Sequence, residues 1–155
     1  REINATEAAL EGYKTDNCIY PAIFTMSQAT SLLNDGTGTT TNYTYSAQML
    51  YQALSGKTNF LDIPVAGVVS YESFKISQLG NAKAAAGSVA PASTYLQDPW
   101  SLAYGYSSGN IVGTTTNAPY NGIGYFDLWS TAGLSKLSPN NGLTNTSAWI
   151  ANWQL

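Results

Sequence analysis

Residues 10–21 read Leu10-Glu11-Gly12-Tyr13-Lys14-Thr15-Asp16-Asn17-Cys18-Ile19-Tyr20-Pro21 and define the end of the first predicted element. From residue 1 to residue 17, apolar side chains recur at helical spacing with charged side chains between them, which predicts an amphipathic helix of about four turns. Pro21 sets its far limit, because the residue before a proline is pushed out of the helical region. No capping residue precedes this pattern, so we expect the helix to continue upstream of Arg1.

Two further helices are predicted in the first third of the chain. The weaker pattern covers residues 27–33 and leads into a polar loop at residues 37–41. The stronger pattern covers residues 46–55, with Ser46 as N-cap and Gly56 as C-terminal stop.

The remaining elements are predicted to be extended. Short extended pieces are expected at residues 63–70 and 74–79, and residues 82–92 form a connection to strands at 101–107 and 123–129. Alternation places Leu102, Tyr104 and Tyr106 on one face of the first strand, and Ile123, Tyr125, Asp127 and Trp129 on one face of the second, opposite Phe126 and Leu128.

The chain ends in a long loop and an aromatic segment. Residues 105–122 supply the turn between the strands, and residues 131–147 are rich in Gly, Ser, Asn and Pro. Burial of Trp149 and Trp153 is expected to pin the far end of this C-terminal loop. The order of elements predicts an α+β fold, with an N-terminal helix packed on a small antiparallel sheet, and neither a repeat nor a linker divides residues 1–155 into more than one domain.

Composition excludes many functions. The 155 residues include no histidine, which rules out Ser-His-Asp and Cys-His catalysis, a histidine zinc site and a histidine-ligated haem. The net charge of -3 has the wrong sign for neutralising phosphates, so nucleic acid and anionic lipid are not expected partners. Cys18 cannot form an internal disulfide, and its neighbours Ile19 and Tyr20 predict that it is buried.

Two aspartates are the only candidate catalytic pair. Asp98 and Asp127 stand among rings that could stack on a sugar, and a glycosidase needs two carboxylates at a fixed separation. A structural role explains each aspartate better. Asp98 precedes Pro99, where an aspartate commonly accepts hydrogen bonds from backbone N–H groups of a turn, and Asp127 lies between apolar neighbours where it can bond a loop. The rings near the pair are Trp100, Tyr104, Tyr125 and Trp129.

The eleven tyrosines and four tryptophans leave a second function open. Exposed rings could form a carbohydrate-binding platform, although aromatic residues at alternate strand positions more often form core or cross-strand pairs. A secreted carbohydrate-binding module that uses exposed Tyr and Trp side chains is therefore the alternative interpretation.

Four blocks of the chain, in order, resemble type II secretion major pseudopilins and related type IV pilin-like proteins. Residues 10–21 are similar to that family's "ALExYKxDNGxYP", which closes its long helix. Three later blocks also match. The motif "DPWGxPY" is similar to Asp98-Pro99-Trp100 with Tyr104, and the motif "FDLYSLG" is similar to Gly124-Tyr125-Phe126-Asp127-Leu128-Trp129-Ser130. The terminal motif "DIxNW" is similar to Ile150-Ala151-Asn152-Trp153. The resemblance assigns structural roles, and no catalytic one, to Tyr20, Pro21, Asp98, Pro99, Trp100, Tyr104, Phe126, Asp127 and Trp153.

The resemblance implies a structural subunit of a pseudopilus or related filament. Family members are methylated proteins made as precursors anchored in the bacterial inner membrane, with this domain in the periplasm or exterior, and trimmed by a prepilin peptidase. They contact other pilin-like subunits through an apolar helix, which lies upstream of Arg1, and they contact the secretion or pilus assembly machinery. We expect this chain by itself to be monomeric and to have no enzymatic activity.

The chain departs from the family pattern at several points. Ser101 and Ala103 replace the glycine and proline of "DPWGxPY", so that turn is expected to differ. The family's C-terminal loops commonly carry aspartates that bind calcium, whereas here no acidic residue follows Asp127 and Trp149 stands at the position of the late aspartate. We therefore expect no cofactor, and calcium at most weakly. Residues 24–92 are also longer than the usual major pseudopilin allows.

Overall fold

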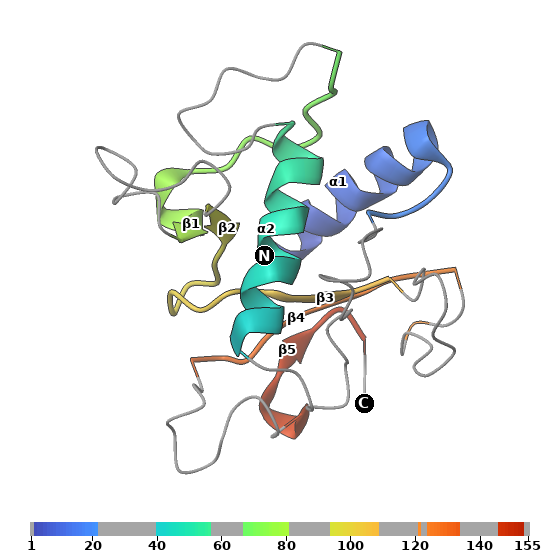
Figure 1. Ribbon diagram of the computed structural model, residues 1–155. Helices are drawn as coiled ribbons and strands as arrows, with labels where there is room; N and C mark the ends of the chain where they lie inside the picture. The colour runs from blue at the N-terminus through green and yellow to red at the C-terminus, as the bar shows by residue number, and fades with distance from the viewer. Residues whose placement is uncertain are drawn as a thin grey trace.

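The computed structural model describes residues 2–21, 40–56, 67–80, 94–108, 121, 124–133 and 146–153. These residues form an α+β fold, as predicted, with two long helices and small antiparallel sheets (Figure 1). The helices are α1 (Glu2–Asn17) and α2 (Thr40–Ser55), and one sheet has the order β3 (Gly105–Ser107), β4 (Asp127–Ser130) and β5 (Ile150–Ala151). A separate pair joins β1 (Leu79–Gly80) to β2 (Tyr95–Leu96), and two single 3-10 turns are η1 (Ile76–Gln78) and η4 (Thr146–Ala148).

Helix α1 has the predicted extent and ends in a left-handed cap. Its apolar residue Leu10 is fully buried, and α1 packs against α2 and β4. Cys18 follows the helix at φ 64°, and its N–H donates to the carbonyl of Lys14 at 2.7 Å. The predicted burial of Cys18 is wrong, because the cap turns its side chain into solvent while Tyr20 is the buried residue of this segment.

Helix α2 begins six residues before the predicted cap. Ser46 lies inside the helix, where its hydroxyl donates to the carbonyl of Tyr106 at 3.0 Å. The predicted start was wrong because residues 40–45 are β-branched, aromatic or amide residues of low helix propensity. The helix nevertheless includes them, because the buried side chain of Tyr43 continues the apolar face of α2 toward its N-terminus. Gly56 ends the helix at φ 67°, as predicted.

The three-stranded sheet alternates as predicted but with shorter strands. In β4, Phe126 immediately before the strand and Leu128 within it face the main core, while Trp129 faces a second cluster. Gly105 pairs with Trp129, and a Cβ at Gly105 would collide with the indole ring. The close approach of the indole therefore requires glycine at this position.

The other predicted extended pieces differ in part. Residues 74–79 contain the turn η1 and only the start of β1. Of the predicted piece 63–70, residues 67–70 form no strand and residues 63–66 lie outside the described residues. In the segment 101–107, only β3 is a strand, with Ala103 forming an isolated bridge to Gln97. The predicted helix 27–33 and connection 82–92 lie outside the described residues, as do most of the predicted turn 105–122 and C-terminal loop 131–147.

The described residues pack into two apolar clusters. The main core joins α1, α2 and the sheets through residues such as Leu10, Leu50 and Leu128. The second cluster gathers the buried rings of Tyr43, Trp129, Trp149 and Trp153. Among the described residues, no helix has the length and apolar character that crossing a membrane requires.

Candidate functional site

The segment after α1 is fastened to the sheet by two tyrosines. Tyr20 is buried and meets the ring of Phe126 edge to face, with 4.9 Å between the ring centroids. The hydroxyl of Tyr106, in β3, donates to the carbonyl of Pro21 at 2.9 Å. Tyr20 and Pro21 therefore join the N-terminal helix to strands more than eighty residues away in sequence.

Asp98 organises the turn before β3. Its Oδ1 accepts the backbone N–H of Trp100 at 3.0 Å and that of Leu102 at 2.9 Å, which confirms the predicted turn-capping role. Its Oδ2 accepts the hydroxyl of Ser130 at 2.5 Å, so this buried carboxylate also ties the turn to β4. Trp100, in the same turn, is 50% exposed.

Asp127 has a different role. Its Oδ1 accepts the backbone N–H of Asn121 at 3.1 Å and the side-chain amide of Asn121 at 3.3 Å, so it bonds a loop as predicted. Asp127 and Ser130 alternate to opposite faces of β4, and Asp98 bonds Ser130. Asp98 and Asp127 are thus held by different partners toward opposite faces of β4, which supports a structural role for each.

The C-terminal block is pinned by indole rings, as predicted. Trp129 stacks on Trp149 at 5.1 Å and meets Trp153 edge to face at 5.5 Å, while its Nε1 donates to the hydroxyl of Tyr43 at 2.8 Å. Trp153 is 8% exposed. The residue before it, Asn152, accepts the N–H of Leu128 through Oδ1 at 2.9 Å.

A groove opens beside these blocks, between α1 and the start of β4, and we call it the α1–β4 groove. Its volume is about 320 Å³. The residues that line it are Glu7, Glu11, Asn121, Tyr125, Phe126 and Asn152.

One wall of the α1–β4 groove is a hydrogen-bonded chain at the end of α1. Glu11 Oε1 accepts the hydroxyl of Tyr20 at 2.6 Å, and Lys14 Nζ donates to that hydroxyl at 3.3 Å and to the carbonyl of Gly124 at 3.2 Å. Burial raises the pKa of Tyr20 well above its ordinary value, and its bond to Glu11 adds to this rise. The hydroxyl therefore stays protonated and holds Glu11 as an acceptor.

The opposite side of the α1–β4 groove consists of two amides and a ring. The side-chain amide of Asn121 donates to the carbonyl of Phe126 at 2.8 Å, and that of Asn152 donates to the same carbonyl at 3.3 Å. Tyr125 stands beside them and is 54% exposed, with Lys14 Nζ 5.4 Å from its ring centroid. The amides are thus fixed in place, and the tyrosine ring is accessible.

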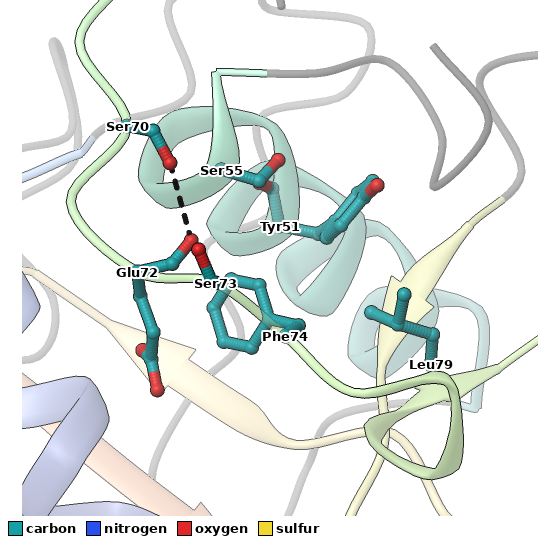
Figure 2. A pocket seen from close by; sticks show the side chains of 7 residues that line it. All are labelled: Tyr51, Ser55, Ser70, Glu72, Ser73, Phe74 and Leu79. Carbon is teal, nitrogen blue, oxygen red and sulfur yellow. Dashed lines mark hydrogen bonds between the residues drawn. The ribbon is translucent and has the colours of Figure 1, made fainter.

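A smaller pocket of about 80 Å³ lies between α2 and residues 70–74 (Figure 2). Tyr51, Phe74 and Leu79 form its apolar side, and Figure 2 shows the Glu72 carboxylate directed away from them. The space suits a few water molecules and not a metabolite, so this pocket is a packing gap in the fold.

Sequence reasoning missed the residues of the α1–β4 groove other than Tyr125 and Phe126. Glu7 and Glu11 are two of the charged residues of the predicted amphipathic helix, and neither Asn121 nor Asn152 belongs to a catalytic or metal-binding motif. The one available signal was Asn152, which lies inside the C-terminal block beside Trp153.

Within the described residues, no three acidic or cysteine side chains gather where they could hold a metal ion. No protein-family model matches the chain, and neither a curated protein nor a solved structure matches it.

Proposed function

We propose that this chain is a structural subunit of a pilus-like filament, in bacterial type II secretion or a related type IV pilus-like system. The supporting observation is the backbone at three positions. Among the described residues, the non-glycine residues with positive φ are Cys18, Ser101 and Ala132, at 64°, 66° and 55°.

Each of these three residues stands where a family motif has glycine. Cys18 occupies the glycine position of "DNGxYP", Ser101 that of "DPWGxPY" and Ala132 the last position of "FDLYSLG". Left-handed backbone is the conformation that glycine favours. The backbone at these three positions is therefore what a glycine in the motif would favour, and this agreement supports the proposal.

The placement of the motif residues supports the same proposal. Tyr20 and Pro21 are buried at the end of α1, where Tyr20 packs on Phe126 and Pro21 accepts the hydroxyl of Tyr106, so these motif residues fix α1 on the sheet. A filament subunit needs such a joint, because its helix must carry the sheet domain at a constant orientation from one subunit to the next.

In this proposal the chain carries no catalysis of its own. Its partners are other pilin-like subunits, contacted through an apolar helix ahead of α1, and the assembly machinery of the cell envelope. Its precursor is anchored in the inner membrane, with this domain in the periplasm or at the exterior.

Immunogold electron microscopy of the source cells tests the proposal. Antibodies raised against this chain are expected to label filaments or membrane-attached fibres, and the label should disappear when the prepilin peptidase is deleted. Diffuse label that the deletion leaves unchanged contradicts the proposal.

A further inference from the structure

We propose that the α1–β4 groove binds a hexosamine unit of a glycan, that is, a hydroxylated sugar ring that carries an amine. The inference goes beyond the filament role, because a subunit can assemble whether or not this groove is occupied. It rests on the groove's volume, charge, remaining hydrogen-bonding capacity and exposed ring.

The groove has the size of a site for one ring. Its volume of about 320 Å³ lies at the lower end of the range of roughly 300–1,000 Å³ usual for small-molecule sites. A single pyranose unit with its substituents therefore fits better than a large planar cofactor.

The charge of the groove selects against anions and for an amine. Glu7 and Glu11 are one turn apart on α1, so both carboxylates lie along one wall. Within the described part of the chain, no ion pair involves Glu7. The nearby ammonium of Lys14 is directed to Tyr20 and Gly124. Two carboxylates against one ammonium leave this wall with a net negative charge, which favours a protonated amine over uronic and sialic acids.

The two amides retain capacity for sugar hydroxyls. Asn121 uses both N–H groups on Phe126 and Asp127, and no described residue donates to its Oδ1, which can act as an acceptor. Asn152 uses its Oδ1 on Leu128 and one N–H on Phe126, and within the described ranges its second N–H has no acceptor and can serve as a donor. A fixed donor and a fixed acceptor on the same side of a groove suit adjacent hydroxyls of a sugar ring.

The ring of Tyr125 provides the apolar contact. It is 54% exposed at the edge of the groove, where the C–H face of a sugar can pack on it. Carboxylates alone would bind any cation, so this ring and the amides distinguish a sugar from a simple ammonium group.

The test is a calorimetric titration of the purified chain with a tetramer of β-1,4-linked glucosamine. Its N-acetylated counterpart of equal length serves as the matched ligand without charge. We expect the glucosamine tetramer to bind at least about tenfold more tightly, because acetylation removes the ammonium group that faces Glu7 and Glu11.

Variants locate the binding. Glu7→Gln and Tyr125→Ala are each expected to weaken binding of the glucosamine tetramer by about tenfold or more. Two control variants should leave the affinity for the glucosamine tetramer within about twofold. Tyr45→Ala removes a 43% exposed tyrosine of α2 outside the groove, and Asp16→Asn removes an exposed carboxylate near the end of α1. Circular dichroism confirms that each variant is folded.

Two results overturn the proposal. The first is the absence of measurable heat with either tetramer at millimolar concentration. The second is a trilysine peptide that binds as tightly as the glucosamine tetramer, together with a Tyr125→Ala variant that binds the tetramer as the wild type does. This result would identify the groove as a site for basic side chains. Neither result bears on whether filaments carry the chain, so the filament proposal is tested separately.

Discussion

Three residues hold a backbone conformation that their side chains disfavour. Cys18, Ser101 and Ala132 each have φ between 55° and 66°, and each ends an element or a turn. In this left-handed region a Cβ atom lies too close to the following carbonyl oxygen, which costs about 1–2 kcal/mol. Glycine has no Cβ and avoids this cost.

Glycine at these positions is expected to stabilise the fold. Cys18→Gly, Ser101→Gly and Ala132→Gly should each raise the free energy of unfolding by about 0.5–1 kcal/mol, after the greater freedom of the unfolded glycine is subtracted. Urea denaturation followed by circular dichroism measures the change. Ala8→Gly, at an exposed position inside α1, is the control and should lower stability by about 1 kcal/mol. A loss of stability at all four positions would contradict the left-handed backbone conformation of Cys18, Ser101 and Ala132.

Asp98 is expected to be the carboxylate most important for stability. Asp98→Ala leaves the N–H groups of Trp100 and Leu102 and the hydroxyl of Ser130 without their acceptor, at a cost of about 2–4 kcal/mol. Thermal and urea unfolding measure this loss. The comparison is Asp16→Ala, which removes a single exposed hydrogen bond from Tyr71 and should cost much less. A loss under about 0.5 kcal/mol, no larger than an ordinary surface change, would refute the role assigned to Asp98.

Residue roles could be predicted where a local pattern specifies them. The Asp-Pro pair indicated the bonds of Asp98 because an aspartate at a turn reaches backbone groups two residues away. Cys18 was placed in the core because its neighbours are apolar, but Ile19 is itself 39% exposed. Burial there depends on how the chain leaves the helix, which neighbours in sequence do not encode.

At the scale of elements, periodicity predicted α1 correctly and α2 in part. The start of α2 depends on Tyr43 meeting Trp129, a contact across the fold that overrides the low helix propensity of residues 40–45. The α1–β4 groove could not be predicted for the same reason. Its amides are aligned by bonds to Phe126, Asp127 and Leu128, which form only when β4 is paired.

A buried acidic contact links α1 to the segment before η1. Glu72 is half-buried, and it faces Glu2 and Thr6 of α1 and Tyr104. One of its carboxylate oxygens has no hydrogen-bond partner among the described residues. Desolvation raises the pKa of Glu72 above 4.5 and the charge of Glu2 adds to this, while the hydrogen bond from Thr6 opposes it.

This contact predicts a pH-dependent effect of Glu72→Gln. The folded protein binds a proton at Glu72 more readily than the unfolded chain does, so this residue makes stability fall as pH rises from 4.5 through its raised pKa. The variant should therefore be more stable than the wild type at pH 7 and equal to it below about pH 4. Urea unfolding across this pH range measures the difference, and an effect that is constant with pH would contradict the prediction.

At the scale of the whole molecule, calcium is expected to have no effect on stability. The segment after Asp127 offers no acidic side chain, and a site built from hydroxyl, amide and backbone oxygens binds calcium on the order of millimolar at best. Thermal melts with excess calcium and with chelator should coincide. A shift of several degrees would show that Asp127 or backbone carbonyls reach the ion.

The chain alone is expected to be monomeric at micromolar concentration. The apolar side chains of α1 are used against the core, and its outward positions are small or polar, namely Asn4, Ala5, Ala8 and Thr15. Little apolar surface of α1 remains for a second copy. Light scattering measures the mass, and a stable dimer or a filament formed by this chain alone would contradict the expectation.

The filament role is tested most directly by cryo-electron microscopy of filaments sheared from the envelope of the source cells. We expect a helical reconstruction in which this domain repeats along the filament, with α1 joined to the sheet through Tyr20 and Pro21 as in the structure. The filament role would be contradicted by a reconstruction that shows no density for this domain, if the source cells make the protein abundantly and release it freely.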